Sequence, residues 1–323
     1  MAEFTGKAQI ISSLQPILST LEFVKIEKTV LEEFCAKVEP RHIVSPNWEH
    51  PAIYPELDEV GIDYFMLMNC VNFCYWGTPK WTVEFEETFY DGAFGMFAAL
   101  TRALREEIPV FEGRFLAGLT QTELHSILRG NVTIPLFEPR LNILREAGRT
   151  LVDEFDGRFF NVVAAADGSA VKLVDILVSR FGSFDDSVDW EGHRVLFHKR
   201  AQLAPAMLHE RWRGEGAGSF SDIDQLTVSA DYKLPQVLRR LGILRYSKSL
   251  EKLIDEDRRI PANSREELEI RATTIQVGEL MRDIIEPNVP GITSQQVDRF
   301  IWLVGQTKTA NEKPYHKTLT TMY

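Results

Sequence analysis

The chain has 323 residues, with 36 Lys and Arg against 47 Asp and Glu, which gives a formal net charge of −11. This acidic balance argues against nucleic acid as a main partner, because phosphates are held chiefly by Lys and Arg. A hydrophobic share of 44% suffices for a sizeable core, which excludes general disorder.

The three cysteines, Cys35, Cys70 and Cys74, are too few and odd in number for a disulfide framework, which favours a reducing compartment. No apolar run approaches the roughly 18 residues that a membrane span needs. At the N-terminus, acidic and polar residues occur before any apolar run that is long enough for a signal peptide. We therefore predict a soluble, cytoplasmic protein with no membrane partner. Cys70 and Cys74 lack a second Cys or His pair, so two buried thiols are a better reading than a zinc site.

The elements in chain order begin with a helical stretch over residues 1–45. Residues 41–79 carry Pro46, Pro51, Pro55 and Pro79 and show no sustained 3.6-residue period, which predicts an irregular packed segment. Nine aromatic residues lie between positions 64 and 90. Such a cluster is usually core, and the alternative is a stacking platform for a flat heterocycle.

From residue 119 onward the pattern is that of amphipathic helices, with apolar positions three and four apart behind a capping residue or an N-terminal proline. The predicted helix starts are Thr120 with Glu123, Pro139, Ser169, Ser264 with Glu267, and Thr293 with Gln296. Strand-like alternation is confined to residues 131–135 and 192–197. We predict a mostly α protein, built as one helical domain over residues 1–323 with an irregular, aromatic-rich N-terminal part and few short strands.

Two patterns that could indicate other chemistry are incomplete. Residues 214–218 are glycine-rich, but they lack the preceding strand and the Lys-Ser/Thr pair of a phosphate loop, so a flexible connection is favoured. His209-Glu210 lacks the second His of a zinc protease motif. We therefore expect no metal and no cofactor.

Residues 198–236 are the densest in unlike polar groups, and each piece has a simple structural explanation. Ser221 with Asp224 could cap a helix over residues 225–228, and Asp231 could cap the helix that Pro235 helps to begin. Taken together, the cations, carboxylates and phenol of this region form the inventory of a phosphorylated sugar or nucleotide site.

Several stretches also occur in the order and spacing of a known family: Asn72 to Trp76, Lys199 to Gln202, Phe220 to Asp224, Ala230 to Gln236, Glu269 to Ala272, and Pro314 to Thr318 with Tyr323. In these stretches the chain resembles the queuosine salvage proteins, which are queuosine 5′-phosphate N-glycosidases. The likeness runs from about Trp48 to the last residue, and the first 45 residues carry little of it.

The resemblance implies an all-α fold similar to that of DNA glycosylases and hydrolysis of the bond between the 7-deazaguanine base queuine and ribose 5-phosphate. Breaking an N-glycosidic bond builds positive charge on the sugar, so a carboxylate beside C1′ is needed, and Asp231 is the catalytic candidate. A 7-deazapurine has carbon in place of the basic N7, so the base must be helped to leave in another way. Asp222 or Asp224 near its aminomethyl cation, and Asn72 on its edge, would fit.

The remaining substrate-binding candidates fall into two groups. Phe73 and Trp76 would stack on the base, and Tyr232 belongs to the same motif as Asp231. The phosphate candidates are Lys199, Arg200, His316 and Tyr323. For Arg271, an intrahelical salt bridge with Glu267 and a role in the site are equally good readings.

Two functions from other classes remain as alternatives. A glycosylase acting on a flipped base in nucleic acid would need a basic surface, which a chain of pI about 5.3 lacks. A noncatalytic helical interaction module would use the aromatic cluster only as core. We expect a monomer whose partners are the nucleotide substrate and the queuine product, and no nucleic acid.

Overall fold

The computed structural model describes residues 3–307 and 312–323, and its elements are mostly helices, as predicted. The α-helices are α1 (Lys7–Ser13), α2 (Gln15–Leu18), α3 (Lys28–Cys35), α4 (Glu59–Cys70), α5 (Gly92–Arg105), α6 (Gly113–Ala117), α7 (Gln121–Ile127), α8 (Phe137–Glu154), α9 (Phe159–Ala165), α10 (Ala170–Arg180), α11 (Lys199–Arg211), α12 (Lys233–Arg240), α13 (Lys248–Asp255), α14 (Arg265–Ile285) and α15 (Ser294–Val304).

The strands form three separate antiparallel pairs. Their members are β1 (Val24–Ile26) with β6 (Leu244–Tyr246), β2 (Thr82–Phe85) with β3 (Thr88–Asp91), and β4 (Ser187–Trp190) with β5 (His193–Leu196). The strand expected over residues 192–197 is confirmed as β5. The one expected over residues 131–135 is wrong. Asn131 donates its N–H to the carbonyl of Thr82, the first residue of β2, and its side-chain oxygen accepts the Thr82 N–H, but no ladder follows.

The helix starts read from the sequence are confirmed by their caps. Thr120 and Thr293 each form a closed capping box, with Glu123 and Gln296 respectively. The hydroxyls of Ser169 and Ser264 accept a backbone N–H at the starts of α10 and α14, and Pro139 lies in the first turn of α8. Because a cap is made by residues three apart in the chain, it can be read without knowing the tertiary fold.

The prediction of an irregular segment over residues 41–79 is wrong for α4, a regular helix of 12 residues. Every residue from Gly61 to Cys70 is buried. A helix that is buried on all sides has no polar face, so it shows no 3.6-residue period in its sequence. The rest of the segment contains only turns and one short 3₁₀-helix, Pro40–His42.

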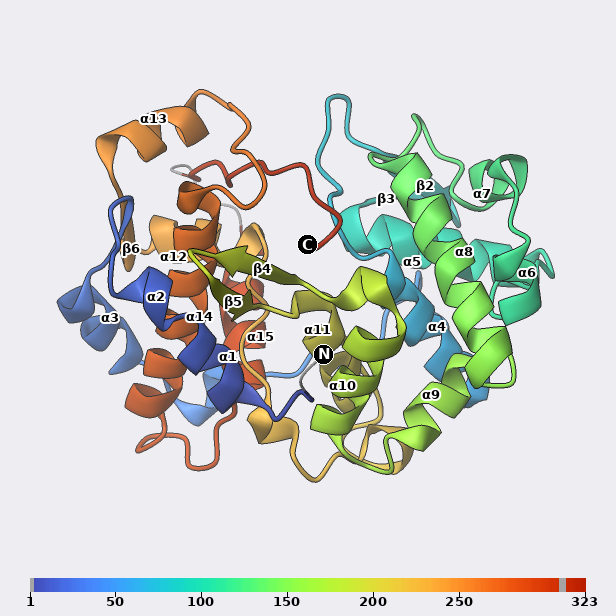
Figure 1. Ribbon diagram of the computed structural model, residues 1–323, viewed down its shortest axis with the longest axis horizontal. Coiled ribbons are helices and arrows are strands. Elements are labelled where there is room, and N and C mark those ends of the chain that lie inside the picture. The colour runs from blue at the N-terminus through green and yellow to red at the C-terminus, as the bar shows by residue number, and fades with distance from the viewer. Residues whose placement is uncertain (1–2, 308–311) are drawn as a thin grey trace.

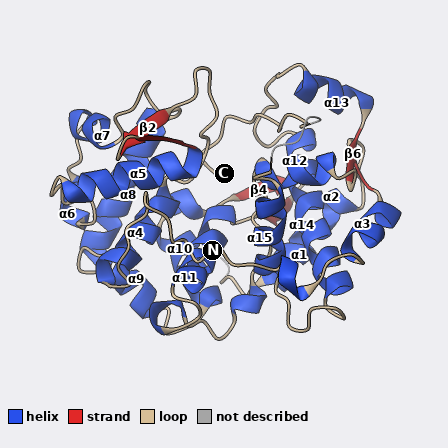
Figure 2. Ribbon diagram, turned by 180° about the vertical axis from the view of Figure 1, so that it is seen from behind, coloured by secondary structure: helices blue, strands red, loops and turns tan. Residues whose placement is uncertain are grey.

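The helices lie in two groups with α10 and α11 between them. Figures 1 and 2 show α4 to α9 on one side and α12 to α15 on the other, and the C-terminus reaches the space between the groups in both views. Helix α11 contacts both α4 and α10, whereas α12, α14 and α15 contact one another. The buried hydrophobic residues form one continuous cluster that extends from Phe4 to Ile301. No helix in the described part of the chain is long and apolar enough to cross a membrane.

Candidate active site

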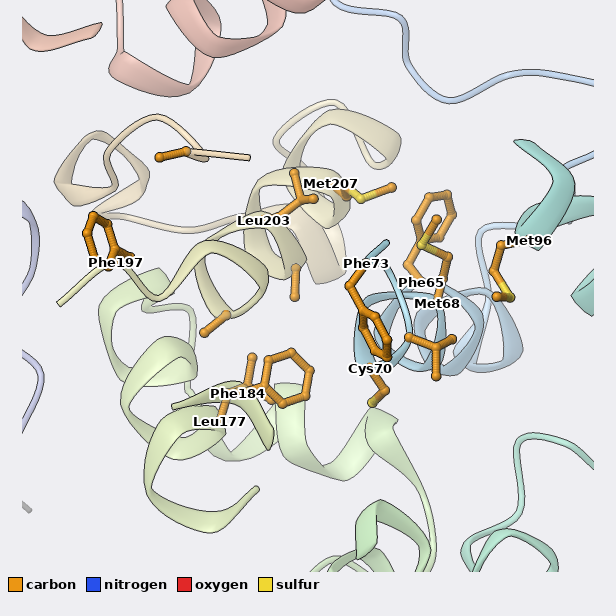
Figure 3. Packing of buried hydrophobic residues seen from close by; sticks show 14 of the residues in the cluster. Phe65, Met68, Cys70, Phe73, Met96, Leu177, Phe184, Phe197, Leu203 and Met207 are labelled. Carbon is orange, nitrogen blue, oxygen red and sulfur yellow. The ribbon is translucent and has the colours of Figure 1, made fainter. Parts of the chain in front are cut away.

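A cavity of about 220 Å³ lies where the two groups of helices meet the chain terminus. Its wall is drawn from α4 and the segment after it, the start of α5, α11, residues 229–234, α15 and Tyr323. Met68, Phe73, Leu203 and Met207 form its apolar floor. Figure 3 shows Phe73 beside Met68 of α4, with Leu203 and Met207 of α11 nearby.

Two buried arginines hold the segment that follows α4. Arg140 of α8 donates to the carbonyl oxygens of Val71, Phe73 and Cys74, and its guanidinium lies 4.2 Å from the centre of the Phe73 ring. Arg200 of α11 donates to the carbonyl of Cys70 at 2.6 Å and to that of Asn69 at 3.1 Å. These carbonyls would otherwise be unsatisfied at a helix C-terminus, so the arginines fix Asn72 and Phe73 at the cavity wall.

Residues 226–230 form a buried segment that belongs to no helix or strand. Side chains of three helices satisfy its backbone: Gln202 accepts the Thr227 N–H at 2.7 Å, and Arg271 donates to the Ala230 carbonyl at 3.1 Å. Asp298 accepts the Ser229 N–H at 2.5 Å. A buried backbone needs such partners, and here they fix the position of the next residue, Asp231.

Asp231 is half-buried at the cavity and also caps α12, as the sequence suggested. Its Oδ1 accepts the N–H of Lys233 at 2.6 Å and that of Leu234 at 3.2 Å. No group in the described part of the chain donates a hydrogen bond to its Oδ2. One carboxylate oxygen therefore orients the side chain, and the other is free for a ligand.

Lys199 is 4% exposed and lines the same cavity. Within residues 3–307 and 312–323, no carboxylate lies within ion-pair distance of its ammonium group, although the charges of Asp231 and Asp298 both act on it. Burial lowers the pKa of Lys199, while these two carboxylates raise it. An unpaired ammonium in a cavity is a site for an anion.

The Asp186–Arg271 ion pair connects the backbone at Lys199 to the backbone just before Asp231. Arg271 donates to both carboxylate oxygens of Asp186, at 2.9 and 2.6 Å, and the same carboxylate accepts the backbone N–H of Lys199 at 3.1 Å. Arg271 also donates to the carbonyl that precedes Asp231. Its contact with Glu267 is longer, at 3.7 Å. Arg271 is thus both a salt-bridge partner and a residue that positions the site.

The structure brings five more predicted residues to the cavity or beside it. Asn72, Phe73, Tyr232 and Tyr323 line it. His316 lies behind Tyr323, with its Nε2 3.2 Å from the phenol oxygen, and burial lowers its pKa to about 3. His316 is therefore neutral, so it supports Tyr323 and offers no positive charge to a phosphate.

Four other predicted residues are not placed at the cavity. Arg200 is used to hold α4, and Trp76 packs near Arg259 and Lys317, each 5.7 Å from its ring. Asp222 accepts the hydroxyl of Ser169 and the N–H of Ala170, both at 2.6 Å, and so helps to cap α10. Asp224 is exposed and accepts the amide of its neighbour Gln225. The helix suggested after it is also absent, since residues 223–225 make only a 3₁₀ turn.

The sequence reasoning missed the residues that α15 and the Trp48 segment contribute. Asp298 and Trp302 line the cavity from α15. Arg299 donates to Glu210 at 3.0 Å and stacks 4.6 Å from the Trp48 ring, whose indole N–H donates to the same Glu210 at 2.6 Å. One sequence feature could have indicated these residues: the charged pair Asp298 and Arg299 lies between the apolar Val297 and Phe300 of a predicted helix.

Three comparisons with curated relatives agree over most of the chain. A protein of Sphaerobacter thermophilus is 36% identical over 323 residues, which is 100% of both chains. A bovine protein is 36% identical over 282 residues, or 82% of each chain, and one of Dictyostelium discoideum is 31% identical over 316 residues, or 93% of this chain and 94% of the relative. All three are named queuosine 5′-phosphate N-glycosylase/hydrolase.

A family model described as queuosine salvage protein matches residues 52–323. The match contains every cavity residue named above except Trp48. With this match and relatives that align along nearly the whole sequence, the chain belongs to the queuosine salvage protein family.

Proposed function

We propose that this protein hydrolyses the N-glycosidic bond of queuosine 5′-monophosphate and releases queuine and ribose 5-phosphate. The observation that carries the proposal is the meeting, in one cavity, of a carboxylate with a free oxygen, an unpaired buried ammonium and an aromatic floor: Asp231, Lys199 and Phe73. The names of the full-length relatives support the same reaction.

Asp231 is the proposed catalytic carboxylate. Its Oδ1 is fixed by two N–H donors, which leaves Oδ2 to face the sugar carbon C1′. A negative charge there stabilises the oxocarbenium-like state and can orient or deprotonate the attacking water. Because the flanking Ala230 and Ser229 are held by Arg271 and Asp298, little reorganisation is needed when the charge develops.

The base is proposed to lie against Phe73, with the side-chain amide of Asn72 at its edge. The guanidinium groups of Arg140 and Arg200 lie 4.2 and 5.3 Å from the centre of the Phe73 ring, so the ring is fixed before the ligand binds. Trp48 and Trp302 add flat apolar surface to the same wall. This arrangement gives the stacking role to Phe73 and leaves Trp76 in a supporting position.

The phosphate is proposed to bind Lys199 and Lys233. Both lysines line the cavity, whereas the third cation of its wall, Arg299, is already paired with Glu210. Lys233 is half-buried, and its ammonium donates to the neutral amide oxygen of Gln236 at 3.0 Å, while the charges of Glu312 and Asp231 also act on it. The buried phenol of Tyr323 also lies at the wall, where burial and the neighbouring Glu267, to which it is hydrogen-bonded, raise its pKa well above the usual value.

We also propose that the protein acts as a monomer, with the cavity residues Asp231, Lys199 and Phe73 all supplied by one chain. A net charge of −11 favours a mononucleotide over a flipped base in nucleic acid, whose many phosphates would meet an acidic protein surface. The cysteines Cys35, Cys70 and Cys74 are buried free thiols, which supports a reducing compartment such as the cytoplasm.

The decisive experiment is a chromatographic assay for free queuine, with purified protein and queuosine 5′-monophosphate as substrate. The nucleoside is run alongside, and the Asp231→Asn variant serves as the inactive control. We expect release of queuine and ribose 5-phosphate in equal amounts, faster from the nucleotide than from the nucleoside. Absence of queuine with both substrates would contradict the proposed function.

A further inference from the structure

Asp298 is a second carboxyl group in the cavity, besides the proposed catalytic Asp231. It lies on α15, is 2% exposed, and lines the cavity with Asp231 and Lys199. Its Oδ2 accepts the N–H of Ser229 at 2.5 Å. Among the described residues, none donates a hydrogen bond to its Oδ1, and no cation lies within ion-pair distance of either oxygen.

The surroundings of Asp298 favour its protonated form far more than those of an ordinary aspartate. Burial raises its pKa to about 6, and the negative charges of Asp231 and Glu210 act in the same direction. Arg299 and the Ser229 N–H oppose this shift, and the ammonium of Lys199 also acts on the cluster. Asp231, by contrast, is half-buried and accepts two N–H bonds on one oxygen.

We propose that Asp298 is the general acid of the reaction and delivers a proton to the departing 7-deazaguanine base. This inference rests on the proposed function. A 7-deazapurine lacks the basic N7 through which a purine can be protonated, so the cavity must supply its proton at a nitrogen near the sugar. Paired carboxyl groups whose environments separate their protonation states commonly divide acid and base roles.

The bond between C1′ and the base nitrogen breaks, its electron pair stays on the base, and the proton of Asp298 adds to a ring nitrogen of that base. Water adds to C1′ and gives its proton to Asp231. The proton gained at Asp231 and the proton lost from Asp298 are exchanged with solvent before the next turnover, so no oxidant or further reactant is consumed.

Two other roles could explain the same position. Asp298 could act only as a structural hydrogen-bond acceptor for the Ser229 N–H, or it could bind the base as an ionised carboxylate. The substitution Asp298→Asn separates these roles, because the amide oxygen can still accept the Ser229 N–H while the group can no longer donate an acid proton. Asp175→Asn is the matched control, since Asp175 accepts the N–H of Phe4 at 2.7 Å and lies outside the cavity wall.

The experiment compares wild type, Asp298→Asn and Asp175→Asn on two substrates. One is queuosine 5′-monophosphate, and the other is p-nitrophenyl ribofuranoside 5-phosphate, whose leaving group departs as a stable anion and needs no proton. We expect Asp298→Asn to lose roughly 100-fold or more in kcat on the nucleotide and less than about 5-fold on the nitrophenyl substrate. Its dissociation constant for queuine should change by less than about 3-fold, and Asp175→Asn should behave as wild type on both substrates.

The pH profile gives a measurement that needs no variant. An acid with a pKa of about 6 loses its proton as the pH rises, so the wild-type kcat on the nucleotide should fall on the alkaline side, whereas the nitrophenyl reaction should not show this fall. Equal losses of Asp298→Asn on both substrates, near-normal kcat, or weaker queuine binding at unchanged kcat would each overturn the proposal. If wild type itself releases no queuine, the proposed function fails, which is distinct from any outcome that concerns Asp298.

Discussion

The phosphate role of Lys199 can be tested by Lys199→Met, which removes the ammonium group and keeps the length of an apolar stem. The side chain is 4% exposed and has no ion-pair partner in the described structure. The folded protein therefore bears the cost of a desolvated charge, and we expect the variant to unfold at the same free energy as wild type or at a higher one. The functional loss should come only when the substrate carries a phosphate.

The magnitude follows from one charge-assisted hydrogen bond. Hydrogen bonds to charged groups contribute ~1.5–3 kcal/mol, and 1.4 kcal/mol corresponds to about tenfold. We therefore expect Lys199→Met to lower kcat/KM for queuosine 5′-monophosphate by about 10- to 150-fold more than it lowers kcat/KM for the nucleoside. Part of this loss should appear in kcat, because binding energy from a nonreacting phosphate can be used at the reacting sugar.

The assay is kcat/KM for both substrates on both enzymes, which closes a double-difference cycle. Lys172→Met, at an exposed lysine of α10 outside the cavity wall, is the control and should not change the ratio. Lys233→Met should lower the nucleotide preference as well. If Lys199→Met lowers the two reactions by the same factor, Lys199 does not bind the phosphate and must act on the sugar, the base or Asp231.

Three further outcomes follow from the same geometry. Asp231→Asn should fold normally, because the amide oxygen can still cap α12, and should lose ~10²–10⁴-fold in turnover; a folded variant with more than a tenth of wild-type activity would assign catalysis elsewhere. Phe73→Leu should weaken queuine binding in calorimetry by ~1–3 kcal/mol, whereas Trp76→Ala should weaken it less, and the reverse order would make Trp76 the platform. In Arg271→Lys, the single ammonium group cannot bond both oxygens of Asp186 and the Ala230 carbonyl together. The free energy of unfolding in urea should therefore fall by ~1–3 kcal/mol, and kcat should fall with it. Unchanged kcat at lowered stability would restrict Arg271 to a structural role.

The sequence by itself determined the helical class and the starts of α7, α8, α10, α14 and α15. The caps at Thr120, Ser169, Ser264 and Thr293 depend on residues three apart, so their signals are local. The order of the family motifs also placed Asn72, Phe73, Lys199 and Asp231 in one site before any distance was known, and the cavity contains all four.

Only the tertiary structure decided which polar residues reach that cavity. Asp222 and Asp231 look alike in the sequence, since each lies near a helix start. In the fold Asp222 caps α10, whose first residues precede it by about 50 positions, whereas Asp231 caps its own helix beside the cavity. Arg200 is adjacent to Lys199, but on a helix neighbouring residues point about 100° apart, so it serves α4 instead of the ligand.

Two parts of the site, α4 and Asp298, could not be predicted from the sequence because their properties depend on burial. Helix α4 has no polar face because protein surrounds it, so its sequence shows no 3.6-residue hydrophobic period. Asp298 owes its raised pKa to the loss of solvent around it and to the negative charges of Asp231 and Glu210, which lie far from it in the sequence. Local spacing records caps and amphipathic faces, whereas desolvation and long-range contacts, which set the charge of a carboxyl group, exist only after the chain has folded.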